Sequence, residues 1–199
     1  MERRASMTAL TRARILSAAG GWIVRNRSSD LQVTDVAALA DVAPRTVYNH
    51  FPTVDDLLSE TMEQVTSEFL TIRLQDPLPS ESAAEAMDRV VREWYANLSA
   101  NSELLRALLQ IHGSPAFDAA LDHARTVRRT TMTAVLRRAE AEGSLAQPFA
   151  DALSLGYALT GFAAWAAFVD EQGMTGEAAG ELVARTMTAV VSGATASAS

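Results

Sequence analysis

The chain has 199 residues, 48% of them hydrophobic, which is enough for one domain or two small ones around a sizeable core. It contains no cysteine, which excludes disulfides, thiolate catalysis and cysteine-based zinc sites and fits a reducing cytoplasm. Residues 1–50 carry seven arginines and four acids, a net charge of +3, whereas residues 51–199 carry ten arginines and twenty acids, a net charge of −10. This asymmetry orients the first part of the chain toward a polyanion, although +3 alone is also an ordinary fluctuation.

The first predicted helix covers residues 8–26. Its inward face holds Leu16, Ala19, Trp22 and Ile23. Gly20 and Gly21 in its middle each cost about 1 kcal/mol relative to alanine, and close packing against a neighbouring helix is one reason for keeping them. The N-terminal segment is charged and lacks the apolar run of a signal peptide.

Residues 31–51 predict two short helices around a tight turn. The first buries Val33, Val36, Ala37 and Ala40 at helical spacing. Asp41 then tolerates a left-handed turn conformation, and Pro44 suits the first position of the second helix. With Val47 and Phe51 inward, the second helix presents Arg45, Thr46, Tyr48, Asn49 and His50 outward. One buried stripe and an outward row of hydrogen-bonding side chains suit the DNA major groove, so the segment is predicted to be a helix-turn-helix.

The run from Val42 to Pro52, with residues 15–19 upstream and 56–58 downstream, resembles the TetR family of bacterial transcriptional regulators. The resemblance implies that Thr46, Tyr48 and His50 contact phosphates, which fixes register without reading sequence. Arg45 and Asn49 are the candidates for base readout, since they can pair bidentately with guanine and adenine. A phosphate contact by Arg45 is an almost equal alternative. The predicted DNA-binding set is Gln32, Thr34, Pro44, Arg45, Thr46, Tyr48, Asn49 and His50.

Several positions depart from the family pattern. Gln32 replaces a capping threonine, with Thr34 as a substitute, and Ala43 replaces the Ser or Thr that caps the recognition helix. Asp41 and Arg27 stand where glycines are usual. Near Val54 a common lysine is absent, which predicts weaker electrostatic affinity and a shallower salt dependence. Four N-terminal arginines are expected to compensate if their segment reaches the duplex. They are Arg3, Arg4, Arg12 and Arg14.

The rest of the chain predicts an all-α protein of about nine helices. Thr53 is the expected N-cap of a helix over 54–73, with Asp55 and Asp56 in its first turn. Later helices are expected at 81–99, 102–112, 115–142, 148–172 and 175–192. The predicted boundaries are a helix-turn-helix DNA-binding domain over 1–52, a connector over 53–76, a ligand-binding and dimerisation domain over 77–193, and a disordered tail over 194–199.

One uncharged stretch, residues 152–169, is long enough to raise the question of a membrane span. Small residues dominate it and both flanks are acidic, which gives no positive-inside signal. We therefore interpret it as a buried packing helix and expect a cytoplasmic protein without a membrane partner. Five arginines on the 115–142 helix are interpreted as a solvated or acid-paired face. They are Arg125, Arg128, Arg129, Arg137 and Arg138.

By the same resemblance, a homodimer binds a palindromic operator and a small-molecule effector releases it. The expected dimer interface uses Leu155, Gly156, Leu159, Phe162, Ala163, Ala167, Leu182, Met187 and Val190. An apolar or aromatic effector is expected to contact Trp94, Leu98, Leu108, His112, Phe117, Met132, Leu136, Tyr157 and Trp165. Both sets also suit plain core packing, and His112 also suits a helix cap. Repression is the family default.

The sequence also bears on two other classes of function. An enzyme is disfavoured because the three histidines have no metal-ligand spacing and no phosphate loop or Gly-x-Ser-x-Gly motif occurs. No cofactor or metal is expected. The second class is a helical protein–protein interaction module whose degenerate helix-turn-helix no longer reads DNA. The departures at Gln32 and Ala43 keep that alternative open, and salt-dependent binding to a specific duplex would separate the two.

Overall fold

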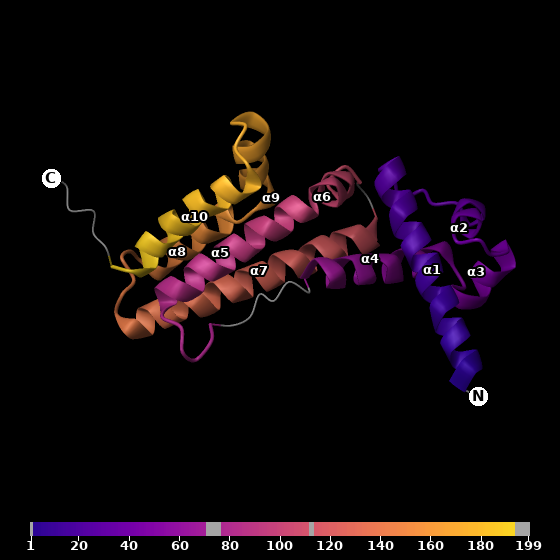
Figure 1. Cartoon of the computed structure of the whole chain (residues 1–199), viewed down its shortest axis with the longest axis horizontal. Helices are drawn as coiled ribbons and strands as arrows, with labels where there is room; N and C mark the ends of the chain where they lie inside the picture. Colours follow the sequence, from indigo (N-terminus) through magenta and orange to yellow (C-terminus); the bar gives the residue numbers. More distant parts are fainter. Residues whose placement is uncertain (1, 71–76, 112–113, 194–199) are drawn as a thin grey trace. The chain divides into compact units, whose positions relative to one another are not determined.

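The computed structural model describes residues 2–70, 77–111 and 114–193, and every regular element within these ranges is a helix (Figure 1). The prediction of an all-α protein is confirmed. The predicted tail over 194–199 lies outside the described residues. The elements are α1 (Glu2–Asn26), α2 (Val33–Leu39), α3 (Pro44–His50), α4 (Val54–Leu70), α5 (Ala83–Ala100), α6 (Ser102–Leu108), α7 (Pro115–Glu142), α8 (Phe149–Leu159), α9 (Phe162–Ala166), η1 (Ala167–Glu171) and α10 (Gly176–Val191).

The chain divides into two compact units. The first unit comprises Met1–Phe69 and Glu103–His123, and the second comprises Leu70–Ser102 and Ala124–Ser199. This division differs from the sequence-based boundaries, which placed residues 103–123 with the ligand-binding domain. Residues 103–123 belong to the first unit because they contribute buried apolar side chains to its core. Their side chains in that core are Leu108, Ile111 and Phe117.

The core of the first unit gathers one apolar stripe from each of its helices. Helix α1 contributes Leu16, Ala19 and Ile23, as predicted, while Trp22 is partly buried beside them. The other fully buried members include Val36, Val47, Phe51 and Leu57. Thr53 caps α4 as expected: its hydroxyl accepts from the Asp56 amide at 3.0 Å, while the Asp56 carboxylate accepts from the Thr53 amide at 3.1 Å. These contacts fix the route from α3 into α4.

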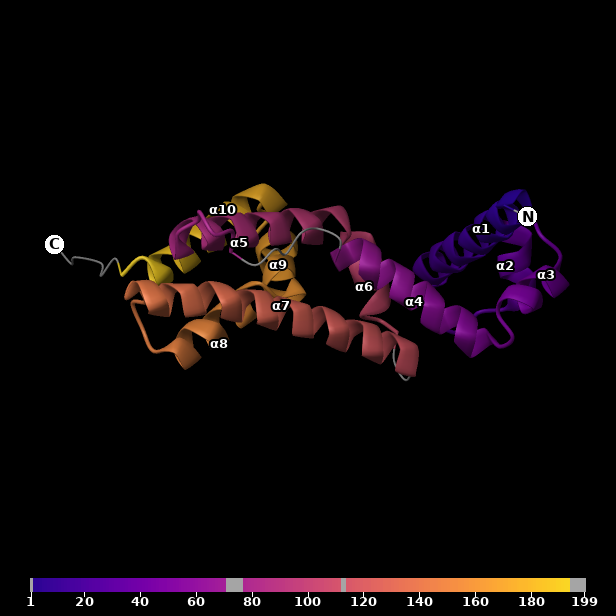
Figure 2. The same ribbon diagram turned by 90° about the horizontal axis from the view of Figure 1, so that it is seen from below.

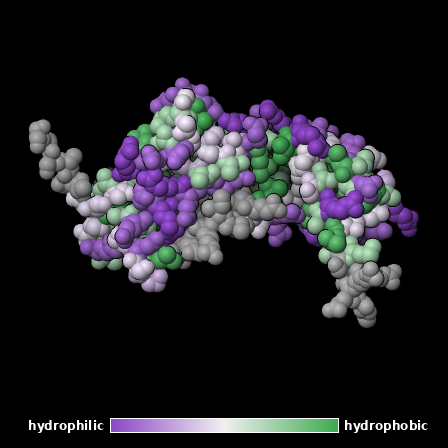
Figure 3. Space-filling model, viewed as in Figure 1, coloured by the Kyte–Doolittle hydropathy of each residue, from purple (hydrophilic) through white to green (hydrophobic). Residues whose placement is uncertain are grey.

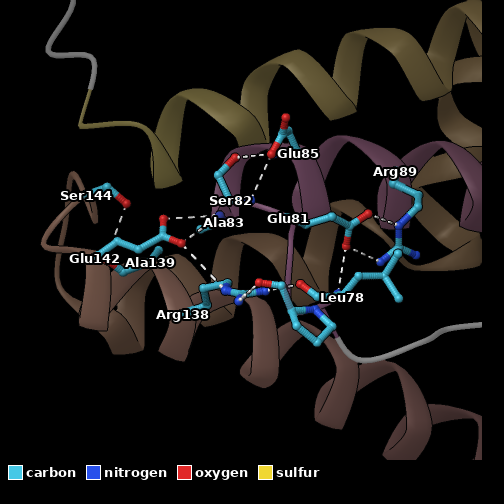
Figure 4. A network of polar contacts seen from close by, with 11 residues as sticks. Leu78, Glu81, Ser82, Ala83, Glu85, Arg89, Arg138, Ala139, Glu142 and Ser144 are labelled. Atoms are coloured by element: carbon cyan, nitrogen blue, oxygen red, sulfur yellow. Dashed lines mark hydrogen bonds and ion pairs between the residues drawn. The ribbon is translucent and has the colours of Figure 1, made fainter.

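In the second unit, α5 runs along α10 (Figures 1 and 2). Helix α5 begins with a capping box between Ser82 and Glu85. Just before it, Glu81 accepts from Arg89 Nε at 2.6 Å and Nη2 at 2.9 Å and from the Leu78 amide at 2.9 Å (Figure 4). These hydrogen bonds lower the pKa of Glu81 to about 2. Hydrophilic residues cover much of the face of α5 and α7 seen in Figure 3.

The predicted single helix over 148–172 is wrong. The structure has α8, which ends at Leu159, and then the run from Phe162 to Glu171, which turns away by 54°. The reason is tertiary: the Trp94 indole donates to the Thr160 carbonyl at 2.6 Å and the Tyr95 hydroxyl donates to the Leu159 carbonyl at 2.7 Å. These carbonyls are the ones a continuing helix would use. Burial also raises the pKa of Tyr95 to about 12.

Among the described residues, no single helix is both long and apolar enough to cross a membrane. Within residues 2–70, 77–111 and 114–193, only α8 taken together with the bent run that follows it reaches the required length and composition.

Candidate nucleic-acid interface

The turn between α2 and α3 is set by Asp41. Its φ of 52° is the left-handed conformation expected from the sequence. The Val42 amide bonds the Ala37 carbonyl at 3.0 Å and the Asp41 amide bonds the Ala38 carbonyl at 3.3 Å. This pair of bonds is a Schellman motif, which satisfies the last carbonyls of α2. Arg27, which follows α1, also has a positive φ, of 50°.

Helix α3 presents one buried and one exposed face, as predicted. Val47 and Phe51, each 1% exposed, fix the helix on the core of the first unit. The opposite side holds exposed Pro44, Arg45, Tyr48 and Asn49 and half-buried Thr46 and His50. Arg45 and Asn49 are four residues apart, so they lie one above the other on a single face. The His50 ring lies against Phe51, with ring centroids 6.3 Å apart.

The departures from the family pattern have structural consequences. Gln32 occupies the N-cap of α2 and Ala43 that of α3, and neither makes a side-chain cap bond. Thr34 lies exposed in the first turn of α2. Val54 starts α4 and packs partly buried against the core, so the position of the missing lysine serves packing here.

Two of the arginines expected to compensate for that lysine are engaged inside the chain. Arg12 forms an ion pair with Glu60 and lies over the Phe51 ring, 5.0 Å from its centroid. Arg14 donates to the Ala40 carbonyl at 2.5 Å and lies 3.6 Å from Asp41. The described part of the chain offers Arg45 no ion-pair partner. Arg45 is therefore the cation on α3 that remains available to an external anion.

The residues predicted to bind an effector fall into both compact units. Leu108 and Phe117 belong to the core of the first unit. His112 lies outside the described residues. The remaining six are in the second unit: Trp94, Leu98, Met132, Leu136 and Trp165 are buried and Tyr157 is half-buried. The Trp165 indole donates to the Ser99 hydroxyl at 3.0 Å.

The predicted dimer residues also differ in exposure. Met187 is 0% exposed, and a Cβ placed on Gly156 would lie 2.8 Å from Met132 Sδ, so both positions serve the core of the protomer. The other seven retain exposed surface. They are Leu155, Leu159, Phe162, Ala163, Ala167, Leu182 and Val190.

Sequence reasoning missed one polar feature of the second unit. Arg128, grouped above with a solvated or acid-paired face, is half-buried against the end of α8. Helical spacing does not reveal this, because the contact depends on where α8 breaks.

Neither a profile of a known protein family nor a curated protein sequence matches the chain. Solved structures do. The SmeT–triclosan complex aligns over 90% of this chain and 90% of its own, with a TM-score of 0.72 and 18% identity. A tetR-family regulatory protein from Rhodococcus RHA1 covers 91% of this chain and 96% of its own, with a TM-score of 0.67 and 18% identity. The superantigen PfiT aligns over 90% and 95%, with a TM-score of 0.69 and 16% identity. The likeness establishes a shared fold, and such a fold carries different functions.

Proposed function

We propose, from the fold that this chain shares with TetR-family transcriptional regulators, that it is a DNA-binding regulator of that family. The observation that carries the proposal is the two-sided character of α3. Val47 is 1% exposed and packs α3 against the core of the first unit, while Arg45, Tyr48 and Asn49 on the other side face solvent. A seven-residue helix presented in this way fits the major groove.

Each exposed side chain then has a chemical role. Arg45 and Asn49 read base edges, since both offer bidentate hydrogen bonding. Thr46, Tyr48 and His50 donate to phosphate oxygens and fix the register of the helix. Gln32, Thr34 and Pro44 complete the contact surface at the starts of α2 and α3.

The proposal is tested by fluorescence anisotropy on labelled duplexes that tile the DNA upstream of the protein's own gene, with scrambled duplex as competitor. The expected result is competitor-resistant binding to one palindromic tile. Arg45→Ala and Asn49→Ala should each weaken binding to that tile about 5- to 100-fold and relax its sequence preference. Thr46→Ala should weaken binding to all duplexes alike. Arg137→Gln, an exposed change on α7, is the control and should change nothing.

We further propose that the protein binds its operator as a homodimer through exposed surface of α8, α9 and α10. A helix-turn-helix domain this small reads few base pairs, so two such domains on a palindrome supply the missing specificity. Leu155→Arg or Val190→Arg should give a monomer in light scattering and abolish operator binding. Leu109→Arg is the matched control, because Leu109 is an exposed leucine (41%) of the first unit. A wild-type monomer that binds the operator tightly would contradict the dimer.

An effector bound among the predicted effector residues of the second unit would release the operator and make the protein a repressor. The SmeT complex with triclosan supports a small-molecule ligand for this fold. Release requires that the ligand favours the conformation that does not bind DNA, since equal affinity for both conformations shifts nothing. Helix α4 follows α3 in the chain and is the element through which we expect the change to reach the helix-turn-helix. Unchanged operator affinity with a saturating ligand would contradict this mechanism.

The uncapped starts of α2 and α3 favour one alternative: a helical interaction module that no longer reads DNA. Its signature in the same assay is weak, sequence-independent binding that modest salt abolishes.

A further inference from the structure

One arginine of α7 differs from its neighbours. Arg137 pairs with Glu140 at 2.7 Å and Arg138 lies 3.6 Å from Glu142, as expected for a solvated or acid-paired face. Arg128 is half-buried instead, and its Nε is buried without a hydrogen-bond partner. No carboxylate of the described residues pairs with it.

The surroundings of Arg128 hold the guanidinium without neutralising it. The group lies over the Tyr157 ring, 4.2 Å from the centroid, and Nη1 is 3.4 Å from the Thr160 carbonyl. That carbonyl already accepts the shorter 2.6 Å bond from Trp94, so the end of α8 does not require Arg128. The 3.4 Å contact with the Thr160 carbonyl therefore does not account for a charged side chain at position 128.

The charge itself persists. Burial lowers the pKa of Arg128, the Tyr157 side chain partly offsets this, and Arg125 adds a smaller lowering, yet arginine stays protonated in proteins. A half-buried cation without a counter-ion has a cost, and a buried N–H without an acceptor adds to it. Both costs would be removed by one anion placed at the Nε edge.

We propose that Arg128 binds the carboxylate group of a small organic acid. Nε and the adjacent Nη2 form the edge of the guanidinium that receives a carboxylate through two parallel hydrogen bonds. Aromatic and apolar side chains lie around the guanidinium: Tyr157 stacks on its face, Trp94 donates to the Thr160 carbonyl that Nη1 also contacts, and Met132 follows one turn later on α7. The ligand is thus an acid with an apolar or aromatic body. The inference deepens the proposed function, because this acid would be the effector.

The test compares acids with their neutral counterparts by isothermal titration calorimetry on the full chain. The pairs are octanoate with 1-octanol, and phenylacetate with 2-phenylethanol. We expect at least one acid to bind tenfold or more tightly than its alcohol. Arg128→Gln should abolish this preference. Arg128→Lys should reduce it, since lysine keeps the charge but cannot donate two parallel hydrogen bonds to one carboxylate. Arg129→Gln is the matched control, because Arg129 is exposed and lies 5.2 Å from the same Tyr157 ring.

Failure of both acids to bind, or an acid preference that survives in Arg128→Gln, overturns the inference. If Arg128→Gln does not fold, the wild-type preference and its reduction in Arg128→Lys decide the matter. Operator anisotropy separates this inference from the proposed function. Specific DNA binding with no acid bound leaves the regulator standing and removes the acid site. Acid binding through Arg128 without any specific duplex leaves the site standing and removes the regulator.

Discussion

Helices α1 and α10 each contain two glycines, but only those of α10 lack room for a side chain. A Cβ on Gly20 of α1 would lie 3.8 Å from Thr61 and Val65, and one on Gly21 would lie 3.9 Å from Arg25, which are ordinary contact distances. A Cβ on Gly180 of α10 would lie 2.9 Å from Tyr95 Cβ. Close packing therefore explains the glycines of α10 and does not explain those of α1.

The largest effect should come from Gly180→Ala. The new methyl group meets a Cβ that cannot move without its backbone, and overpacking of this kind costs about 1–3 kcal/mol. The better helix propensity of alanine offsets only part of that cost. We expect a lower unfolding midpoint in guanidinium, followed by circular dichroism. Gly156→Ala is a useful comparison, because its nearest atoms are the flexible ends of Met132 and Met187, so it should cost less. Unchanged stability in Gly180→Ala would show that α5 and α10 can separate freely.

Gly20→Ala and Gly21→Ala should act in the opposite direction. Each replaces glycine in a helix interior where the Cβ has space, so each should stabilise the protein by about 1 kcal/mol. The same unfolding measurement checks both, and the double variant should be additive within experimental error. A destabilised Gly20→Ala would mean that α1 and α4 approach more closely than the structure indicates.

A smaller gain is expected where a side chain occupies a left-handed turn. Asp41 has a φ of 52°, a conformation that costs an ordinary residue about 1 kcal/mol and an aspartate less. Asp41→Gly should therefore raise the stability of the first unit by a fraction of that amount. Asp41→Ala is the control: it removes the carboxylate but keeps the Cβ, so it should give no gain. Equal stabilisation by both changes would assign the effect to charge instead of backbone.

Acid should act selectively on the second unit through Glu81. Its pKa, about 2 in the folded protein, lies below the usual 4.5 because Arg89 and the Leu78 amide bond the charged form. The stabilisation by Glu81 is thus fully present above pH 4.5 and is lost as the pH falls through about 2. Glu81→Gln should be less stable than the wild type at neutral pH, and the difference should disappear in strong acid. Parallel pH profiles for the two proteins would contradict the assignment.

Most of the candidate DNA-binding face followed from local sequence. Val47 and Phe51 have the spacing of one helix face, Asp41 tolerates the turn, and Pro44 starts a helix; each of these depends on residues only a few positions away. Thr53 as the cap of α4 is of the same kind. The absence of a side-chain cap at Gln32 was also foreseeable, because glutamine is a poor capping residue.

The second unit shows what the sequence by itself left open. Residues 152–169 carry no charge and are rich in small residues, and only the bonds from Trp94 and Tyr95 to the end of α8 reveal where the helix breaks. The burial of Arg128 follows from that break. Short-range periodicity determines which face of a helix is apolar. Tertiary packing determines which distant helix covers that face and which backbone carbonyls accept hydrogen bonds from the distant helix's side chains.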